Sequence, residues 1–147
     1  MIVKEMREAD CLQVVTTQNV AHLASCIRDR PYVVPVQYVY SNGLIYSFSM
    51  PGRKVDNMRE NPNVCLQIEE FRDGRHWKSV VVEGRFRELP STSERQDAWE
   101  ILQHGNNAWW EPGALKPNPS EASVGTSPHL FYTVSIDQMS GRRTADD

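Results

Sequence analysis

The sequence lacks long hydrophobic runs, and no apolar stretch approaches the roughly 20 residues that a membrane-spanning helix needs. Cysteine is scarce and odd in number. Cys11, Cys26 and Cys65 are widely spaced, so they form neither a zinc-type spacing nor a complete set of disulfides. Reduced thiols are the simpler interpretation, and residues 1–5 lack the basic-then-apolar pattern of a signal peptide. We therefore expect a cytoplasmic protein.

An excess of positive charge is also missing. The net charge of −3 and the pI near 5.8 argue against a surface built for nucleic-acid phosphates, although a local basic site for one small anion remains compatible with them. The 147 residues, 39% of them hydrophobic, suit a single domain with one buried core. The chain shows neither an internal repeat nor a composition shift, so we expect one domain over residues 1–147.

Hydrophobic periodicity predicts a mainly β protein with a few helices. Short strands joined by hairpins, without βαβ alternation, favour an antiparallel barrel over a parallel sheet. Apolar spacing and capping signals predict helices over residues 5–17, 51–60 and 91–104. Strands are predicted over residues 20–27, 31–40, 44–49, 63–71, 77–89 and 129–137.

Several local signals refine this outline. Asn42-Gly43 between two strand-like runs predicts a two-residue hairpin. Gly84, inside a predicted strand, indicates a bulge or the close approach of another backbone or a ligand. Ser91 with Glu94 fits a capping box, although Thr92 is a second candidate cap. Residues 106–127, rich in Asn, Pro, Gly and Ser, predict a long surface loop, and residues 142–147 a flexible tail.

A phosphate site is indicated where the helix over 51–60 begins. Arg53 and Lys54 fall in its first turn, where cations oppose the helix dipole at a cost of roughly 0.3–1 kcal/mol each. The conflict disappears if an anion occupies the helix N-terminus. Gly52 allows close backbone approach, and Ser49 offers a hydroxyl from the preceding strand. The alternative is a solvated basic patch balanced by the acidic residues at 56 and 60.

Four segments, in this order, resemble the FMN-binding split-barrel superfamily of the pyridoxamine 5'-phosphate oxidases. They are PYVVPVQYVY (31–40), IYSFSMPGRKVDNMRENPNV (45–64), SVVVEGRF (79–86) and YTVSIDQMSGR (132–142). The second is the most specific, because a strand, Gly-Arg-Lys and a helix ending in Asn-Pro-x-Val occur together. The likeness is greatest to the small flavin-nucleotide-binding branch that includes nitroimidazole-resistance proteins.

The resemblance implies a set of cofactor contacts. The strand at Pro35 and Val36 would face the flavin ring, and the strand at Tyr46 and Ser47 would run along the ring and ribityl chain. The remaining implied contacts are Ser49, Arg53 and Lys54 at the phosphate, where Gly52 allows close approach, and Ser79 on the long strand. Apart from the resemblance, Trp109 is a candidate contact, because its indole could stack on the flavin or pack in the core or an interface. The resemblance also implies a homodimer with two flavin sites at the interface.

The sequence also departs from the oxidases themselves. It shows no C-terminal segment rich in Arg and His, and position 79 is Ser where the oxidases tend to have Gln, so vitamin B6 oxidation is not expected. Haem and deazaflavin are alternative cofactors in small relatives. His22 could be a haem ligand or proton donor, although a packed or exposed histidine is the favoured interpretation.

These observations together predict an FMN-dependent oxidoreductase. A reduced nicotinamide, NADH or NADPH, would supply electrons that pass through FMN to a small acceptor. No nucleophile–base pair is recognisable, so we assign no catalytic side chain. The alternatives are a non-catalytic FMN carrier or sensor, and a haem-binding or haem-degrading relative.

Overall fold

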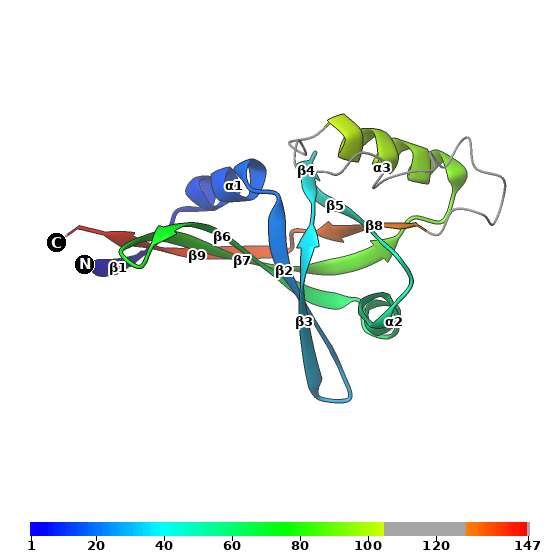
Figure 1. The fold of residues 1–147 in the computed structure, drawn as a ribbon, viewed down its shortest axis with the longest axis horizontal. Helices are drawn as coiled ribbons and strands as arrows, with labels where there is room; N and C mark the ends of the chain where they lie inside the picture. The colour runs from blue at the N-terminus through cyan, green and yellow to red at the C-terminus, as the bar shows by residue number, and fades with distance from the viewer. Residues whose placement is uncertain (105–128, 147) are drawn as a thin grey trace.

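The computed structural model describes residues 1–104 and 129–146 of the chain, and these form nine strands and three helices (Figure 1). All strand pairs are antiparallel. In chain order the elements are β1 (Ile2–Glu5), α1 (Glu8–Thr17), β2 (Val20–Ile27), β3 (Arg30–Gln37), β4 (Val39–Ser41), β5 (Leu44–Ser49), α2 (Arg53–Glu60), β6 (Asn63–Asp73), β7 (His76–Glu88), α3 (Thr92–His104), β8 (Leu130–Ser135) and β9 (Gln138–Ala145).

Strand β7 belongs to both halves of the sheet. The strand order is β3-β2-β6-β7-β8-β5-β4, and β9 pairs with both β7 and β1. Residues 78–83 of β7 pair with β9, whereas residues 86–88 pair with β8. The end of the chain therefore lies along β7 twice, first as β8 and then as β9. It bends between these two strands at residues 136–137. This bend divides the sheet into two halves that share one long strand.

Gly84 of β7 lies opposite that bend, against Ser135. A β-carbon there would collide with the carbonyl oxygen of Ser135, so the prediction of a close backbone approach is confirmed. The bend is closed by two further bonds. The Ser135 hydroxyl accepts the N–H of Arg85 at 3.0 Å, and the N–H of Asp137 donates to the carbonyl of Glu83 at 2.9 Å.

Two clusters of buried side chains hold the elements together. The larger one lies under α1, where Cys11, Val14 and Val15 pack with the inward residues of β6 and β7. The smaller one lies under α3 and contains Ala98, Leu102 and residues of β4 and β8. No helix within the described ranges is long and apolar enough to cross a membrane.

Two local predictions are confirmed in detail. Asn42 and Gly43 have φ angles of 50° and 83°, as a two-residue turn with left-handed central residues requires. At α3, the Ser91 hydroxyl accepts the N–H of Glu94 at 3.1 Å, and the two side chains are also bonded at 3.3 Å. Ser91, not Thr92, is the cap of this helix.

Other expectations were wrong. The helix expected from residue 5 begins at Glu8, and residues 2–5 before it form β1, which was not expected. The strand expected over 31–40 is two strands, β3 and β4. They divide at Tyr38, which turns inward so that its hydroxyl donates to the carbonyl of Val15 at 2.7 Å.

The end of the chain differs most from the prediction. The strand expected over 129–137 is β8, and it is followed by a further strand, β9. The flexible tail expected at 142–147 was wrong for residues 142–145, which pair with β1 on one side and, in part, with β7 on the other. The loop predicted over 106–127, including Trp109, lies outside the described residues.

Candidate functional site

The first turn of α2 carries two cations, Arg53 and Lys54. Gly52, the residue before the helix, is extended at φ 171°, and nothing lies within 4 Å of where its β-carbon would be. Within residues 1–104 and 129–146, neither Arg53 nor Lys54 forms an ion pair. Glu60 instead lies 3.8 Å from the guanidinium of Arg28. Within the described ranges, neither acidic residue of the alternative interpretation, at 56 or at 60, forms an ion pair with these two cations.

Arg53 and Lys54 have different surroundings. The Arg53 guanidinium lies 4.3 Å from the ring centre of Tyr32 on β3, a cation–π contact that holds it beside that strand. Lys54 is half-buried, and burial lowers the pKa of its ammonium group because the charged form loses water. An anion placed beside Lys54 would reverse that effect. The start of α2 thus offers positive charge that its own fold leaves uncompensated.

Polar contacts fix the orientation of α2 on the sheet. Asn57 is buried and donates to the Ser25 hydroxyl at 3.4 Å, and Asn61 donates to the carbonyl of Cys26 at 2.8 Å. Arg59 forms a two-point ion pair with Glu88 of β7, with contacts of 2.6 and 3.0 Å. These bonds lie on the middle and end of the helix, so its first turn is positioned while its N–H groups stay open.

The serines of β5 are less available than the sequence suggested. Ser49 is buried, and its hydroxyl donates to the carbonyl of Met50 at 2.8 Å. That hydroxyl can still accept a bond. Ser47 is buried and donates to the carbonyl of Gln37 at 2.6 Å. Val36 is also buried in the core. For Ser47 and Val36, only backbone groups are placed to meet a ligand.

Strand β3 supplies such backbone groups along an unpaired edge. Among the described strands it pairs only with β2. The N–H of Tyr38 donates to the carbonyl of Asn19 at 3.1 Å, so even-numbered residues of this segment point their polar groups at β2 and odd-numbered ones point outward. Pro31 and Pro35 fall on the outward set, where a missing N–H breaks no ladder bond. The N–H of Val33 and the carbonyls of Pro31, Val33 and Pro35 therefore face the open edge.

Ser79 belongs to a different group on the outer face of the sheet. Its hydroxyl accepts the side-chain N–H of Gln67 at 2.9 Å, and the oxygen of Gln67 lies 3.0 Å from Nδ1 of His22. His22 is directly opposite Pro35 across the β2–β3 pair. Two strands separate β3 from β7, so Ser79 lies about 14 Å from β3 at a spacing of about 4.8 Å per strand. Ser79 and the edge of β3 are thus too far apart to meet one ring within one chain.

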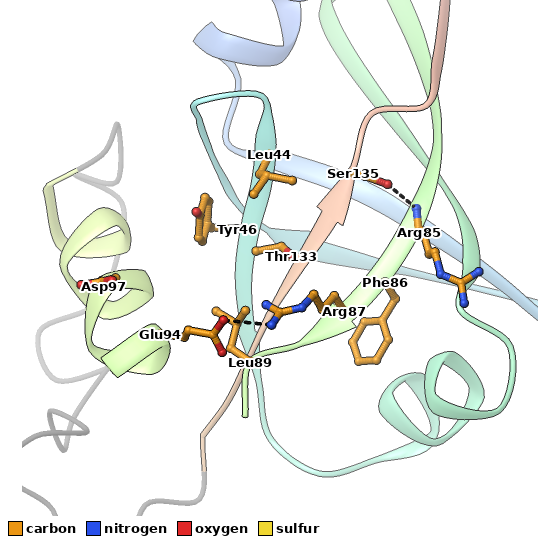
Figure 2. A pocket seen from close by; sticks show the side chains of 10 residues that line it. All are labelled: Leu44, Tyr46, Arg85, Phe86, Arg87, Leu89, Glu94, Asp97, Thr133 and Ser135. Carbon is orange, nitrogen blue, oxygen red and sulfur yellow. Dashed lines mark hydrogen bonds and ion pairs between the residues drawn. The ribbon is translucent and has the colours of Figure 1, made fainter. Parts of the chain in front are cut away.

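A cavity lies elsewhere in the described part of the chain. It has a volume of about 670 Å³ and is situated between α3 and strands β5, β7 and β8 (Figure 2). Tyr46 lines it, whereas Arg53 and Lys54 do not. In it, Arg87 pairs with Glu94 at 2.9 Å. Tyr46 therefore points away from the side of β5 that carries Ser47 and Ser49.

The structure thus gathers the predicted residues unequally. Gly52, Arg53 and Lys54 lie together at the start of α2, where Arg53 contacts Tyr32 of β3. Tyr46 lines the cavity beside α3, Ser79 lies on the outer face of the sheet, and the Pro35 carbonyl faces the open edge of β3. Trp109 falls outside the described residues. Sequence reasoning missed Tyr32 and Gln67. Neither carries a local signal, because each acquires its partner only through folding: Tyr32 meets Arg53, and Gln67 meets His22 on another strand.

An antiparallel sheet split into two halves about one shared strand, with a basic helix start at its edge, defines the FMN-binding split-barrel class of fold. The sequence model of the pyridoxamine 5'-phosphate oxidase family matches residues 7–143, and the chain belongs to this family.

Individual relatives agree with this assignment. An uncharacterized protein of Rhizobium meliloti (strain 1021) is 51% identical over 146 residues, which cover 97% of this chain and 95% of the relative. The crystal structure of a FAD-binding protein from Mesorhizobium loti is 42% identical, with a TM-score of 0.78, over 99% of this chain and 100% of that one. A structure described as a 5-nitroimidazole antibiotic resistance protein, from Bacteroides thetaiotaomicron, matches over 97% of this chain and 89% of that one at 18% identity and a TM-score of 0.73, a likeness of fold.

Proposed function

We propose that this protein binds FMN and acts as an oxidoreductase. The observation that carries the proposal is the start of α2, where Arg53 and Lys54 form no ion pair with any described residue and Arg53 lies against Tyr32 of β3. A phosphate ester fits the open N–H groups of the helix and the two cations. A heterocycle with ring N–H and carbonyl groups fits the alternating polar groups of the β3 edge. The FAD-binding relative from Mesorhizobium loti supports a flavin as the group that combines both.

Residues of α2 and β3 would hold the flavin mononucleotide portion of the cofactor. Arg53, Lys54 and the backbone at Gly52 would bind its phosphate, and the N–H of Val33 with the neighbouring carbonyls would bind the ring edge. Contacts from α2 to β2 and β7 would keep this arrangement in place before binding, which limits the entropy lost on association. When bound, the flavin supplies hydride transfer from NADH or NADPH to a small acceptor.

We further propose a homodimer in which each flavin lies between two subunits. Ser79 and the β3 edge lie on different parts of one chain, so a site using both needs two chains. The outer face of β2, β6 and β7 carries no helix of the described chain. Its centre is uncharged and half-buried, as interface centres are, and a hollow of about 470 Å³ beside Cys26 would admit partner side chains. The half-buried central residues are Ala24, Cys65, Gln67, Ser79 and Val81.

A substitution at the centre of this face tests the dimer. Val81→Glu would bury a charge in the interface, so we expect the protein to sediment as a 16.8 kDa monomer and to lose flavin affinity. Glu69→Gln, at the exposed margin, is the matched control and should leave the dimer intact. A monomeric wild-type protein that still binds FMN would contradict the shared site.

The cofactor and the reaction need separate experiments. A flavin absorbance spectrum of the purified protein, followed by chromatography of the released flavin, distinguishes FMN from FAD. Stopped-flow mixing with NADH or NADPH then distinguishes an enzyme from a carrier, because only the enzyme is reduced rapidly and reoxidised by an acceptor. Protein without flavin that also fails to bind added FMN or FAD would refute the proposal. We also propose a cytoplasmic location, with which the three free cysteines are compatible.

A further inference from the structure

A row of three polar side chains crosses the outer face of the sheet. It runs from His22 on β2 through Gln67 on β6 to Ser79 on β7, with bonds of 3.0 and 2.9 Å. The carboxylate of Glu69 lies 3.5 Å from the Gln67 nitrogen and is the nearest charge bonded to the row. The Glu69 carboxylate orients the Gln67 amide, because an ionised carboxylate only accepts hydrogen bonds. The Gln67 nitrogen therefore lies on the side of Glu69 and Ser79, and its oxygen faces His22.

This orientation determines which nitrogen of His22 carries the proton. Since the Gln67 oxygen accepts, Nδ1 of His22 must be the donor. Nε2 of the neutral imidazole is then a hydrogen-bond acceptor, and the exposed ring leaves it accessible. Ordering a half-buried glutamine and an exposed histidine costs side-chain entropy, and a β-branched residue would suit this strand position better. Sheet stability alone therefore gives little reason for the row.

The row ends beside the proposed ring site. His22 is paired with Pro35 of β3, so both side chains lie on the same face, one strand spacing of about 4.8 Å from the open backbone edge. The outward carbonyls of Pro31, Val33 and Pro35 make that edge richer in acceptors than in donors. The N–H of Val33 suits a ring carbonyl, and Nε2 of His22 adds on the same side an acceptor for the single N–H of an oxidised flavin ring.

We propose that His22 contacts the flavin ring in the assembled site, with Nε2 accepting a hydrogen bond from a ring N–H, and that Gln67 and Ser79 are positioning residues for its imidazole. This assignment rests on the proposed flavin function and extends it to residues outside the phosphate site. His22 would hold and orient the ring. Toward the ring bound at β3 of the same chain, Gln67 would act through His22, and Ser79 through Gln67.

The test measures FMN affinity and the state of the His22 ring in the full-length protein. His22→Phe keeps a planar ring but removes the acceptor, so FMN binding should weaken by about twofold to tenfold, the range for one net hydrogen bond. His104→Phe, at the exposed end of α3, is the matched control and should bind as wild type. Gln67→Leu should weaken binding as His22→Phe does.

Nitrogen NMR of the unaltered protein gives a readout independent of folding defects in the variants. It should show the Nδ1–H form of His22 without flavin, and a shift of Nε2 when FMN is added. A His22→Phe variant with wild-type affinity, or a His22 signal unmoved by saturating FMN, would overturn the assignment while leaving flavin binding intact. Failure of the wild-type protein to bind any flavin would overturn both.

Discussion

Helix α3 begins with a completed cap, whereas α2 begins with a glycine and two cations. At α3 the Ser91 hydroxyl accepts the N–H of Glu94, and the Glu94 carboxylate returns to Ser91 and pairs with Arg87. At α2 the residue before the helix is Gly52, which has no side chain to offer, and the next two residues oppose the helix dipole. One chain thus contains both arrangements.

The contrast shows that the open start of α2 is not a general property of this sequence. The α3 start satisfies its N–H groups internally, as expected where stability alone decides. The α2 start is held in place by Asn57, Asn61 and Arg59 further along the helix, but no described side chain caps its N–H groups. The comparison therefore separates a helix start that is capped internally from one that fits the proposed phosphate.

Removal of both cations should have the largest effect. In the Arg53→Ala, Lys54→Ala double variant, two charge-assisted contacts of roughly 1.5–3 kcal/mol each are lost, so FMN binding should weaken by at least about 100-fold. Fluorescence titration measures the affinity. Arg72→Ala with Arg75→Ala, at the exposed β6–β7 turn, removes the same charge and should bind normally. An unchanged affinity in the first variant would refute the placement of the phosphate.

Lys54→Met should separate binding from stability. We expect FMN affinity to fall by about tenfold or more, while the flavin-free protein melts at the same or a higher temperature, because a half-buried cation no longer has to lose water. The lowered pKa of Lys54 adds a pH signature. The unfolded chain holds this proton more tightly, so wild-type stability should rise as pH approaches 10.5, and the variant should lose that rise. A clear fall in the melting temperature of the flavin-free Lys54→Met protein would contradict this view. Lys4→Met is the control.

Ser91→Ala should affect α3 alone. Loss of an N-terminal cap costs about 1 kcal/mol, or about 2–4 °C of melting temperature for a chain of this size. Flavin affinity should not change, since the cap is remote from α2. If the variant bound FMN more weakly than wild type, the two helix starts would not be independent.

The Glu94 carboxylate gives a smaller, pH-dependent effect. The bond from Arg87, with Ser91 contributing, lowers its pKa below the ordinary 4.5. Its stabilisation is therefore complete above that value and is lost as pH falls through the lowered pKa. Carbon NMR of the Glu94 carboxyl should show the lowered midpoint, and Arg87→Leu should return it toward 4.5. An ordinary midpoint in the wild-type protein would show that the pair does not persist in solution.

Gly52→Ser should give the smallest change and make α2 resemble α3. The extended backbone and the open space at Gly52 accept a side chain, and a serine cap is worth only a few tenths of a kcal/mol over glycine. Thermal melting should show a slight gain. FMN affinity should decrease, because the new hydroxyl competes with phosphate for the same N–H groups. Stronger FMN binding would argue that these N–H groups do not meet the ligand.

Local chemistry explains which parts of the fold were predictable. Ser91 with Glu94, Asn42 with Gly43, and the open start at Gly52 each depend on residues within a few positions of one another, so their patterns are visible in the sequence. The family resemblance likewise predicted the split-barrel fold. The dipole conflict at Arg53 and Lys54 identified the start of α2 as exceptional before its geometry was known.

Long-range pairing explains what was missed. Strand β1 has four exposed residues and no alternating pattern, and it exists because Ile2 faces Ala145 across the sheet. Strand β9 is mostly polar, and it likewise exists because it pairs with β1 and β7. The break at Tyr38 depends on a hydroxyl that reaches Val15, and the row from His22 depends on a register of β2 against β6. No window of sequence contains both members of these pairs.

The sharing of β7 between the two halves has a consequence for folding. Neither half can separate from the other without breaking the pairs that β7 makes with β6, β8 and β9, so partial unfolding by halves is not available to this chain. Loss of the tertiary structure should be a single cooperative event. The amides of β7 that are bonded on both sides, near residues 80–82, should then exchange with solvent only when the entire domain opens.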